Sequence, residues 1–236
     1  MVISMKTYKY PCVFPHYMKF TFIETKYDGI VKVPKKVIDK LPKQVGLFLT
    51  VQFIDSLESV KKQIEDSGRD VIIQKGKHTK YMGQIYGCNL EKFESEAFFY
   101  IGDGLFHPKA LVLGNDKDVH IYNPVKEEYK IVNKKLMENE IRRQKAGLSL
   151  FYMKNEIGVI VSTKNGQSYL KQAMKLKDKY PDKNFYYVAF DTIDFNNLED
   201  FNFIEVWVNT ACPRIGWDDT KRITKPMVDL GTVLSD

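Results

Sequence analysis

The stretch "VGLFLTVQFIDSLESVKKQIEDSGRDVIIQ", residues 45–74, decides the fold. It begins with a continuous apolar run, which is typical of a strand buried on both faces in a parallel sheet. Leu57, Val60 and Ile64 then recur at helical spacing, and Gly68 ends this predicted helix before the short apolar run "DVIIQ". A strand, a helix and a second strand in this order predict a parallel βαβ unit.

The same alternation extends on both sides of this stretch. Apolar residues between two prolines predict a helix in "PKKVIDKLP" (34–42). Further strands are predicted at 19–24, 97–101, 110–114 ("ALVLG") and 118–123 ("DVHIYN"). From about Val132 the pattern turns helical through "KKLMENEIRRQKAG", the best candidate for a linking helix. These segments predict a first α/β domain over residues 18–131, after a short leading segment at 1–17.

A second domain, residues 132–236, is predicted because the pattern of the first one repeats. "EIGVIVSTKNGQ" (156–167) is again an apolar strand that ends in hydroxyl and amide residues, and "SYLKQAMKLKDKYP", "NFYYVAFD" and "FIEVWVNTAC" follow as helix, strand and strand. The fold class is therefore α/β, with two similar parallel-sheet units. Ligands of such sheets gather at the carboxyl ends of strands. The loops after Leu49, Ile101, Val161 and Val208 should then share one functional rim.

Charge and composition exclude several classes of protein. The formal charge of +6 comes from lysines spread along the chain, so no compact basic arm predicts nucleic-acid or membrane binding. No apolar run is long enough for a membrane span, and the N-terminus lacks a signal-peptide pattern, which favours a cytoplasmic protein. Cys12, Cys88 and Cys212 lie far apart and outside CxxC pairs, so any metal site they form must be assembled across the domains.

Several separated segments, taken together, resemble the diphthamide synthase family, the 2-(3-amino-3-carboxypropyl)histidine synthases. In order, the matching segments are "TVQFIDSLESVKKQIE", "GQIYGC", "FFYIGDGLFHPKAL", "YNP", "IRRQKAG", "GVIVSTKNGQ" and "VNTACPRIGWDD" with "ITKP" after it. The motif around Cys212 is the most specific of them. This chain departs from the family pattern at Leu105, where the family usually has arginine.

The resemblance implies similar α/β units around a central cleft, three in the family, with one cysteine from each unit binding a [4Fe–4S] cluster. Here residues 1–17 are expected to be only a remnant of the family's first domain. Cys88 and Cys212 match the family's second and third cluster ligands. Cys12 is either the third ligand or a thiol of the N-terminal segment without such a role.

The resemblance also implies a reaction. Three thiolates on a four-iron cluster leave one iron open for a substrate, which in this family is S-adenosylmethionine. Its 3-amino-3-carboxypropyl group is transferred by radical chemistry to C2 of a histidine of elongation factor 2, with electrons from an external donor. The alternative is a non-catalytic accessory subunit that binds elongation factor 2 or supports a full-length catalytic partner. The expected assembly is a homodimer or a heterodimer with a longer family member.

Polar residues at the predicted rim are candidates for binding S-adenosylmethionine, because they offer hydroxyl, amide and backbone donors. They are Thr50, Gln52, Gln84, His107, Ser162, Thr163, Lys164, Gly166, Gln167, Asn209 and Arg214. The alternatives are helix capping by the Ser and Thr residues, a turn-anchoring role for His107, and an ion pair of Arg214 with Asp218 or Asp219. His16, His78 and His120 show no metal-ligand spacing and are expected at the surface or in turns. The sequence assigns no catalytic residue.

Overall fold

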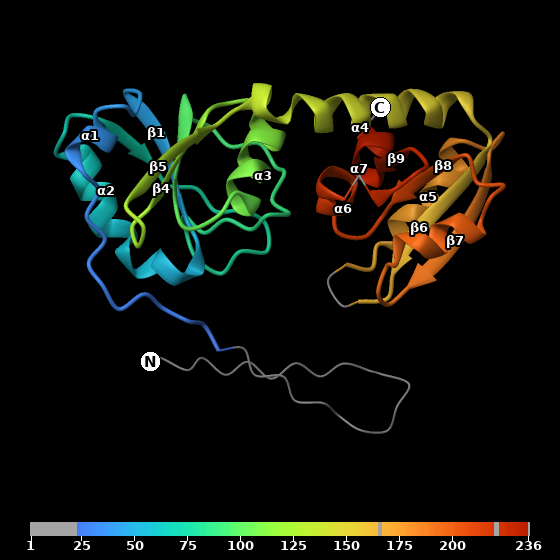
Figure 1. Cartoon of the computed structure of the whole chain (residues 1–236), viewed down its shortest axis with the longest axis horizontal. Helices are drawn as coiled ribbons and strands as arrows, with labels where there is room; N and C mark the ends of the chain where they lie inside the picture. Colours follow the sequence, from blue (N-terminus) through green and yellow to red (C-terminus); the bar gives the residue numbers. More distant parts are fainter. Residues whose placement is uncertain (1–22, 165–166, 220–221, 236) are drawn as a thin grey trace. The chain divides into compact units, whose positions relative to one another are not determined.

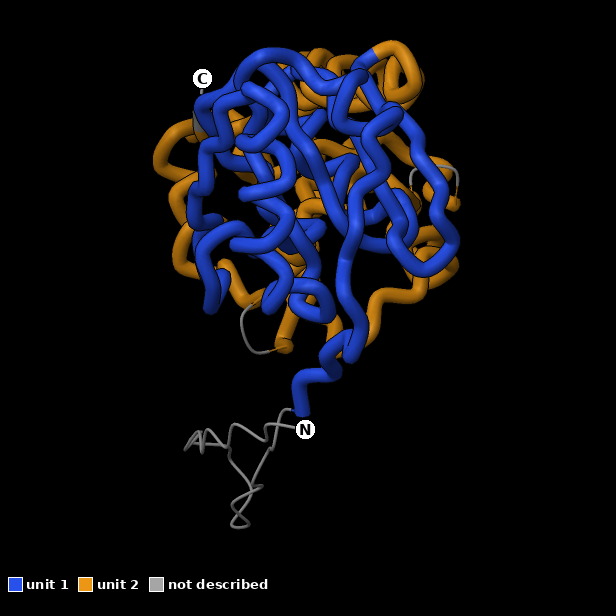
Figure 2. Tube along the Cα trace, turned by 90° about the vertical axis from the view of Figure 1, so that its left-hand side faces the viewer, with its two compact units in different colours: residues 1–134 blue, residues 135–236 orange. Residues whose placement is uncertain are grey.

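The computed structural model describes residues 23–164, 167–219 and 222–235. The chain divides into two compact units, Met1–Lys134 and Lys135–Asp236, which Figure 2 distinguishes by colour. Each unit is built around its own sheet (Figure 1). The α/β class with two mostly parallel sheets is therefore confirmed, and the central cleft between units stays a prediction.

The sheet of the first unit has the strand order β2-β1-β3-β4-β5. Its strands are β1 (Gln44–Leu49), β2 (Asp70–Ile72), β3 (Ala97–Ile101), β4 (Val119–Asn123) and β5 (Glu128–Val132). The first four are parallel, whereas β5 pairs antiparallel with β4. The sequence did not predict β5, because this strand lies at the sheet edge and buries little apolar surface.

Helices cover both faces of this first sheet (Figure 1). Helices α1 (Lys35–Ile38) and α2 (Leu57–Glu65) and the short helix η1 (Val51–Ser56) contribute to one core with alternate residues of β1, among them Leu47 and Leu49. Helix α3 (Phe106–Asn115) lies across the sheet from α2. Each fully buried side chain of this kind contributes roughly 1.5–3 kcal/mol to stability. The strands that end at the rim are thus anchored from both sides.

The predicted strand at residues 110–114 is wrong, because these residues belong to α3. A short apolar run fits a strand or a buried helix equally well by its pattern. The topology decides, since parallel strands such as β3 and β4 need a crossover connection and that connection is usually a helix. Pro108 does not interfere, because it stands in the first turn, where a proline is tolerated.

The sheet of the second unit has the order β7-β6-β8-β9, all parallel. Its strands are β6 (Glu156–Ser162), β7 (Asn184–Phe190), β8 (Val206–Asn209) and β9 (Met227–Asp229). Helices α4 (Glu138–Met153), α5 (Leu170–Lys179) and α7 (Leu230–Ser235) supply core residues to one face, and the short helix η3 (Phe195–Asp200) supplies them to the other. The remaining helices are η2 (Lys134–Met137), before α4, and α6 (Arg214–Asp218), which follows Cys212.

Two further predictions concern segments outside these sheets. Residues 19–22 of the strand predicted at 19–24 lie outside the described residues, and Ile23 and Glu24 are not in a strand. Within the described part of the chain, none of the helices combines the length and the apolar character needed to cross a membrane.

Candidate functional site

Cys88 reaches the carboxyl edge of the first sheet through the segment that precedes it. Gln84 forms an isolated parallel bridge with Leu49, the last residue of β1. The Leu49 N–H donates to the Gly83 carbonyl at 2.7 Å, and the Ile85 N–H donates to the Leu49 carbonyl at 3.3 Å. Residues 83–85 therefore extend the sheet at its carboxyl end, and the loop that carries Cys88 starts from there.

Side-chain amides and an aromatic ring fix the loop around Cys88. Asn89 is buried, accepts from the Tyr86 N–H at 2.8 Å and donates to the Lys77 carbonyl at 2.9 Å. Phe106, the first residue of α3, packs on Gly87 so closely that a Cβ on Gly87 would lie 2.1 Å from its ring. Cys88 itself is exposed. The loop is thus ordered, and it presents the Cys88 side chain at the surface.

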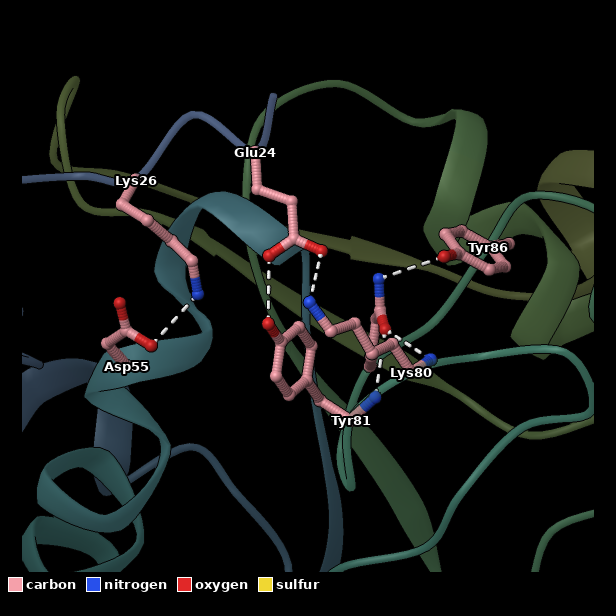
Figure 3. Close-up of polar contacts among 7 residues, drawn as sticks. Glu24, Lys26, Asp55, Lys80, Tyr81 and Tyr86 are labelled. Atoms are coloured by element: carbon pink, nitrogen blue, oxygen red, sulfur yellow. Dashed lines mark hydrogen bonds and ion pairs between the residues drawn. The ribbon is translucent and has the colours of Figure 1, made fainter. Parts of the chain in front are cut away.

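Gln84 organises the turn that leads into this loop. Its Oε1 accepts from the backbone N–H groups of Lys80 and Tyr81 at 2.9 and 3.1 Å, and its Nε2 donates to the Tyr86 hydroxyl at 3.2 Å. Figure 3 also shows Glu24 held by the Lys80 ammonium and the Tyr81 hydroxyl. These two hydrogen bonds lower the pKa of Glu24. Gln84 thus acts in the loop structure, at the position where the sequence suggested a ligand contact.

Replacing Gln84 by leucine should loosen this turn. The change removes the acceptor of the Lys80 and Tyr81 N–H groups, and losing such a buried partner costs about 1–3 kcal/mol. We expect tryptic cleavage after Lys80 to become at least about fivefold faster under native conditions. Met82→Ala, at an exposed position of the same loop, is the control. Equal cleavage rates in Gln84→Leu and the control would contradict this role.

A cavity of about 330 Å³ opens at the carboxyl ends of β1, β3 and β4. The predicted residue Gln52 lines it, together with Asp103 and Asn123 and with two lysines, Lys26 and Lys126. Lys26 pairs with Asp55 at 2.9 Å (Figure 3), and Lys126 lies 3.7 Å from Asp103. This mixture of amide, carboxylate and ammonium groups suits a small polar or zwitterionic molecule.

Thr50 lies beside this cavity without lining it. Its side chain is buried, donates to Gln52 Oε1 at 3.3 Å and makes no capping hydrogen bond to η1. The helix-capping alternative therefore does not describe Thr50. Its contact with Gln52 makes it a support for a residue that does face the cavity.

The histidines have different environments. His107 lies in the first turn of α3. Its ring lies nearly parallel to that of Tyr100, with 6.3 Å between the ring centroids. His120 is buried in β4, with Nδ1 2.7 Å from the Tyr129 hydroxyl, so its expected surface or turn position is wrong. Burial lowers the pKa of His120. His78 does lie in an exposed turn, with φ 65°, and His16 lies outside the described residues.

Cys212 follows β8 at the carboxyl edge of the second sheet. The buried Asn209 side chain donates from Nδ2 to the Cys212 carbonyl at 2.9 Å and accepts from the Ala211 N–H at 3.1 Å. The same carbonyl accepts from the Ile215 N–H at 3.0 Å, where α6 begins. Both donors of Asn209 are thus used within the protein, since its Nδ2 also donates to Asp229 at 2.6 Å.

Partial burial raises the pKa of the Cys212 thiol, and the backbone and charge of Arg214 oppose that shift. Arg214 is buried, and its guanidinium binds both carboxylate oxygens of Asp218 at 2.9 Å. This is the ion-pair alternative that the sequence left open for Arg214. The ion pair lies within the single turn of α6, and Cys212, just before this helix, is partly accessible.

The loop after β6 is held by local hydrogen bonds. Ser162 accepts from the Lys164 N–H at 3.1 Å, Thr163 donates to the Phe190 carbonyl at 3.3 Å, and the Gln167 N–H donates to the Lys164 carbonyl at 3.1 Å. None of these side chains caps α5, whose first turn has no side-chain cap. Gly166 lies outside the described residues.

A buried group beneath the Cys212 loop was missed by the sequence analysis. Asp229 ends β9, Gln144 comes from α4, and Gly216 of α6 lies against both, since a Cβ there would be 2.9 Å from Asp229 Oδ1 and 2.8 Å from Gln144 Nε2. Burial raises the pKa of Asp229 to about 7, and the hydrogen bond from Asn209 and the neighbouring Trp217 side chain oppose the shift. The motif "ITKP" shortly before Asp229 marked this region, but nothing in it singled out the carboxyl group.

The two described cysteines fit an iron–sulfur cluster by the chemistry of their donors, because thiolates are the ligands that such clusters take. Each unit supplies one of them. Within residues 23–164, 167–219 and 222–235, no three His, Cys, Asp or Glu side chains group together as a metal site. Cys12 lies outside these ranges.

Comparisons with known proteins identify the family of this chain. The model of the diphthamide synthesis protein family matches residues 7–232. The 2-(3-amino-3-carboxypropyl)histidine synthase of Pyrococcus horikoshii is 29% identical over 92% of this chain and 63% of its own length. Subunit 1 of the Schizosaccharomyces pombe synthase is 30% identical over 84% of this chain and 48% of its own.

A solved structure is similar as well. Crystalline Dph2 from Pyrococcus horikoshii with a 4Fe-4S cluster superposes with a TM-score of 0.71 and 29% identity, over 83% of this chain and 57% of that one. The chain therefore spans about half to two thirds of the length of these relatives.

Proposed function

Because the chain belongs to the diphthamide synthesis family, we propose that it forms part of the iron–sulfur transferase of the first step of diphthamide synthesis. Its substrates are S-adenosylmethionine and a histidine of elongation factor 2. The observation that carries the proposal is the pair Cys88 and Cys212. Cys212 follows the end of β8, and Cys88 follows the bridge that joins Gln84 to the end of β1. Each loop is held by the side-chain amide of a buried asparagine.

In this proposal Cys88 and Cys212 hold the cluster, with Cys12 as the third thiolate. When bound, such a cluster would supply the electron for reductive cleavage of S-adenosylmethionine, and an external donor would replace that electron. The chain's own residues bind and orient the substrate. Gln52, in the cavity at the carboxyl ends of the first sheet, is suited to bind the amino-carboxypropyl group or the ribose. The loop from Ser162 to Gln167 offers further donors from the second unit.

An accessory role in the same pathway is the second candidate. The Schizosaccharomyces pombe relative is named subunit 1 of its synthase, and this chain spans 48% of it. In this alternative the chain pairs with a longer family member that holds the complete ligand set. Either form is expected to act in the cytoplasm, where elongation factor 2 works, as a homodimer or heterodimer.

Iron binding tests the proposal. The purified full chain is reconstituted without oxygen with iron and sulfide, and iron is counted per chain. We expect about four irons in the wild type and less than about one in Cys88→Ala and Cys212→Ala, since each change removes a thiolate ligand. Met82→Ala, in the loop before Cys88, is the control and should bind as the wild type does.

Cys12→Ala separates the two candidates. Loss of iron in this variant would make the chain's own cysteines a complete set and support the enzyme. An iron-free wild type would overturn the self-sufficient enzyme and leave the accessory role. Iron that persists in Cys212→Ala would contradict the ligand assignment in either role.

A further inference from the structure

Two polar side chains form a buried pair beneath the Cys212 loop. Asn209 and Asp229 end the neighbouring parallel strands β8 and β9 and are register partners. They are only 2% and 7% exposed, and Asn209 Nδ2 donates to Asp229 Oδ1 at 2.6 Å. A carboxyl group buried in this way is costly unless hydrogen bonds or a cation compensate it. Arg214, the nearby buried cation, is paired with Asp218.

The neighbours of Asn209 allow only one orientation of its amide. Its Nδ2 faces two acceptors, the Cys212 carbonyl at 2.9 Å and Asp229 Oδ1, and its Oδ1 faces a donor, the Ala211 N–H. A flipped amide would place oxygen against both acceptors and nitrogen against the donor. Asp229 therefore fixes which way Asn209 points, and Asn209 in turn holds the backbone carbonyl of Cys212.

Residues of two helices, α6 and α4, pack around this pair. Gly216 of α6 leaves room for Asp229, since a Cβ would lie 2.9 Å from its Oδ1. Gln144 of α4 donates from Nε2 to the Gly216 carbonyl, which ties α6 to the helix behind it. Water is thereby kept from the bonds between Asp229, Asn209 and the Cys212 carbonyl, and hydrogen bonds in such a site are stronger than in water.

We propose that Asp229 is a positioning residue for Cys212: through Asn209 it fixes the backbone from which the thiol is presented. The meaning of this arrangement for catalysis rests on the proposed function, in which Cys212 is a cluster ligand. The positioning itself is a property of the iron-free chain and can be measured there.

The rate at which iodoacetamide alkylates Cys212 in the folded, iron-free full chain reports on the loop, and mass spectrometry resolves it from Cys88. Asp229→Leu removes the acceptor of Asn209 and should speed alkylation of Cys212 by about three- to tenfold, the effect of one hydrogen bond on a local equilibrium. Asp229→Asn keeps an acceptor oxygen and should stay within about twofold of the wild type. Cys88 should react equally in every variant.

Two further variants separate positioning from general stability. Tyr180→Phe removes a hydrogen bond to the Val233 carbonyl in the same unit, away from the loop, and should leave the Cys212 rate unchanged. Asn209→Leu combined with Asp229→Leu removes both members of the buried pair, so neither is left without its partner. The double variant should fold even if Asp229→Leu does not, yet react as quickly.

Three results would overturn the proposal: a wild-type rate in the folded leucine variants, an Asp229→Asn rate as high as that of Asp229→Leu, or an equal acceleration in Tyr180→Phe. None of these outcomes depends on iron. A failed reconstitution of the cluster is therefore distinguishable from a failed positioning role.

Discussion

Replacing Trp207 by alanine should lower the free energy of unfolding of the second unit by about 3–5 kcal/mol. The Trp207 side chain is fully buried in β8. It packs over Gly158 of β6, where an added Cβ would lie 2.4 Å from the indole, and edge-on against Phe201 at 5.9 Å. Gly158 has no side chain that could move into the vacated space, so the cavity left by the indole stays largely open. The loss of stability should therefore be at the high end for replacements of a buried aromatic residue by alanine.

Tryptophan fluorescence in urea measures this effect in the second unit alone. The chain has two tryptophans, Trp207 and Trp217, and both lie in that unit, so Trp217 remains as the reporter. Phe203→Ala is the control, since this aromatic residue is 48% exposed and should change the stability by less than about 1 kcal/mol. If Trp207→Ala lowered the free energy of unfolding by less than about 1 kcal/mol, the packing of the indole would not be a main source of stability for β8.

The position of Trp207 links this stability effect to the candidate site. Asn209 and Cys212 follow it on the same strand and loop. A loss of 3–5 kcal/mol is a large part of the roughly 5–15 kcal/mol of a typical domain. The variant should therefore also bind less iron at 37 °C than at 10 °C, in contrast to Phe203→Ala.

The repeating strands and helices were predictable because their signals are local. The apolar runs that became β1 and β6 are too short for long helices and too continuous for exposed strands. Helix α2 followed from the spacing of Leu57, Val60 and Ile64, all of which are buried. The rule that ligands gather at strand ends then placed Cys212, which follows β8, at the carboxyl edge of its sheet. The Cys88 loop reaches such an edge only through the tertiary bridge between Gln84 and Leu49.

The errors arise where tertiary pairing decides the structure. Residues 110–114 are helical because β3 and β4 are parallel and need a crossover. Strand β9 has only three residues, too few to show the alternation of apolar and polar residues that marks a strand. It forms because it pairs with β8. Asp229 was missed for the same reason, since its role depends on lying beside Asn209. Gln144 was missed because only the packing of α4 brings it to Gly216.

Asp229 should also make the stability of the second unit depend on pH. Burial raises its pKa from 3.8 to about 7 in the folded protein, whereas the unfolded chain has the ordinary value near 3.9. The folded state therefore holds this proton more tightly. The stabilisation is complete below about pH 4 and is lost as the pH rises through 7, at about 1.4 kcal/mol per pH unit within that window, on the order of 4 kcal/mol in all.

Asparagine at this position cannot ionise and still accepts a hydrogen bond from Asn209. Between pH 5 and pH 8, the wild type should lose roughly 2–3 kcal/mol more stability than Asp229→Asn, because the pKa of Asp229 in the folded protein lies between these two pH values. Urea unfolding followed by tryptophan fluorescence at both pH values gives this difference, and other titrating groups cancel because the two proteins share them. Asp182→Asn, at an exposed carboxyl group of the same unit, should follow the wild type. If Asp229→Asn lost as much stability as the wild type, the Asp229 carboxyl group would be ionised in the folded protein throughout this range. Its burial would then have to be offset by more than its hydrogen bond from Asn209.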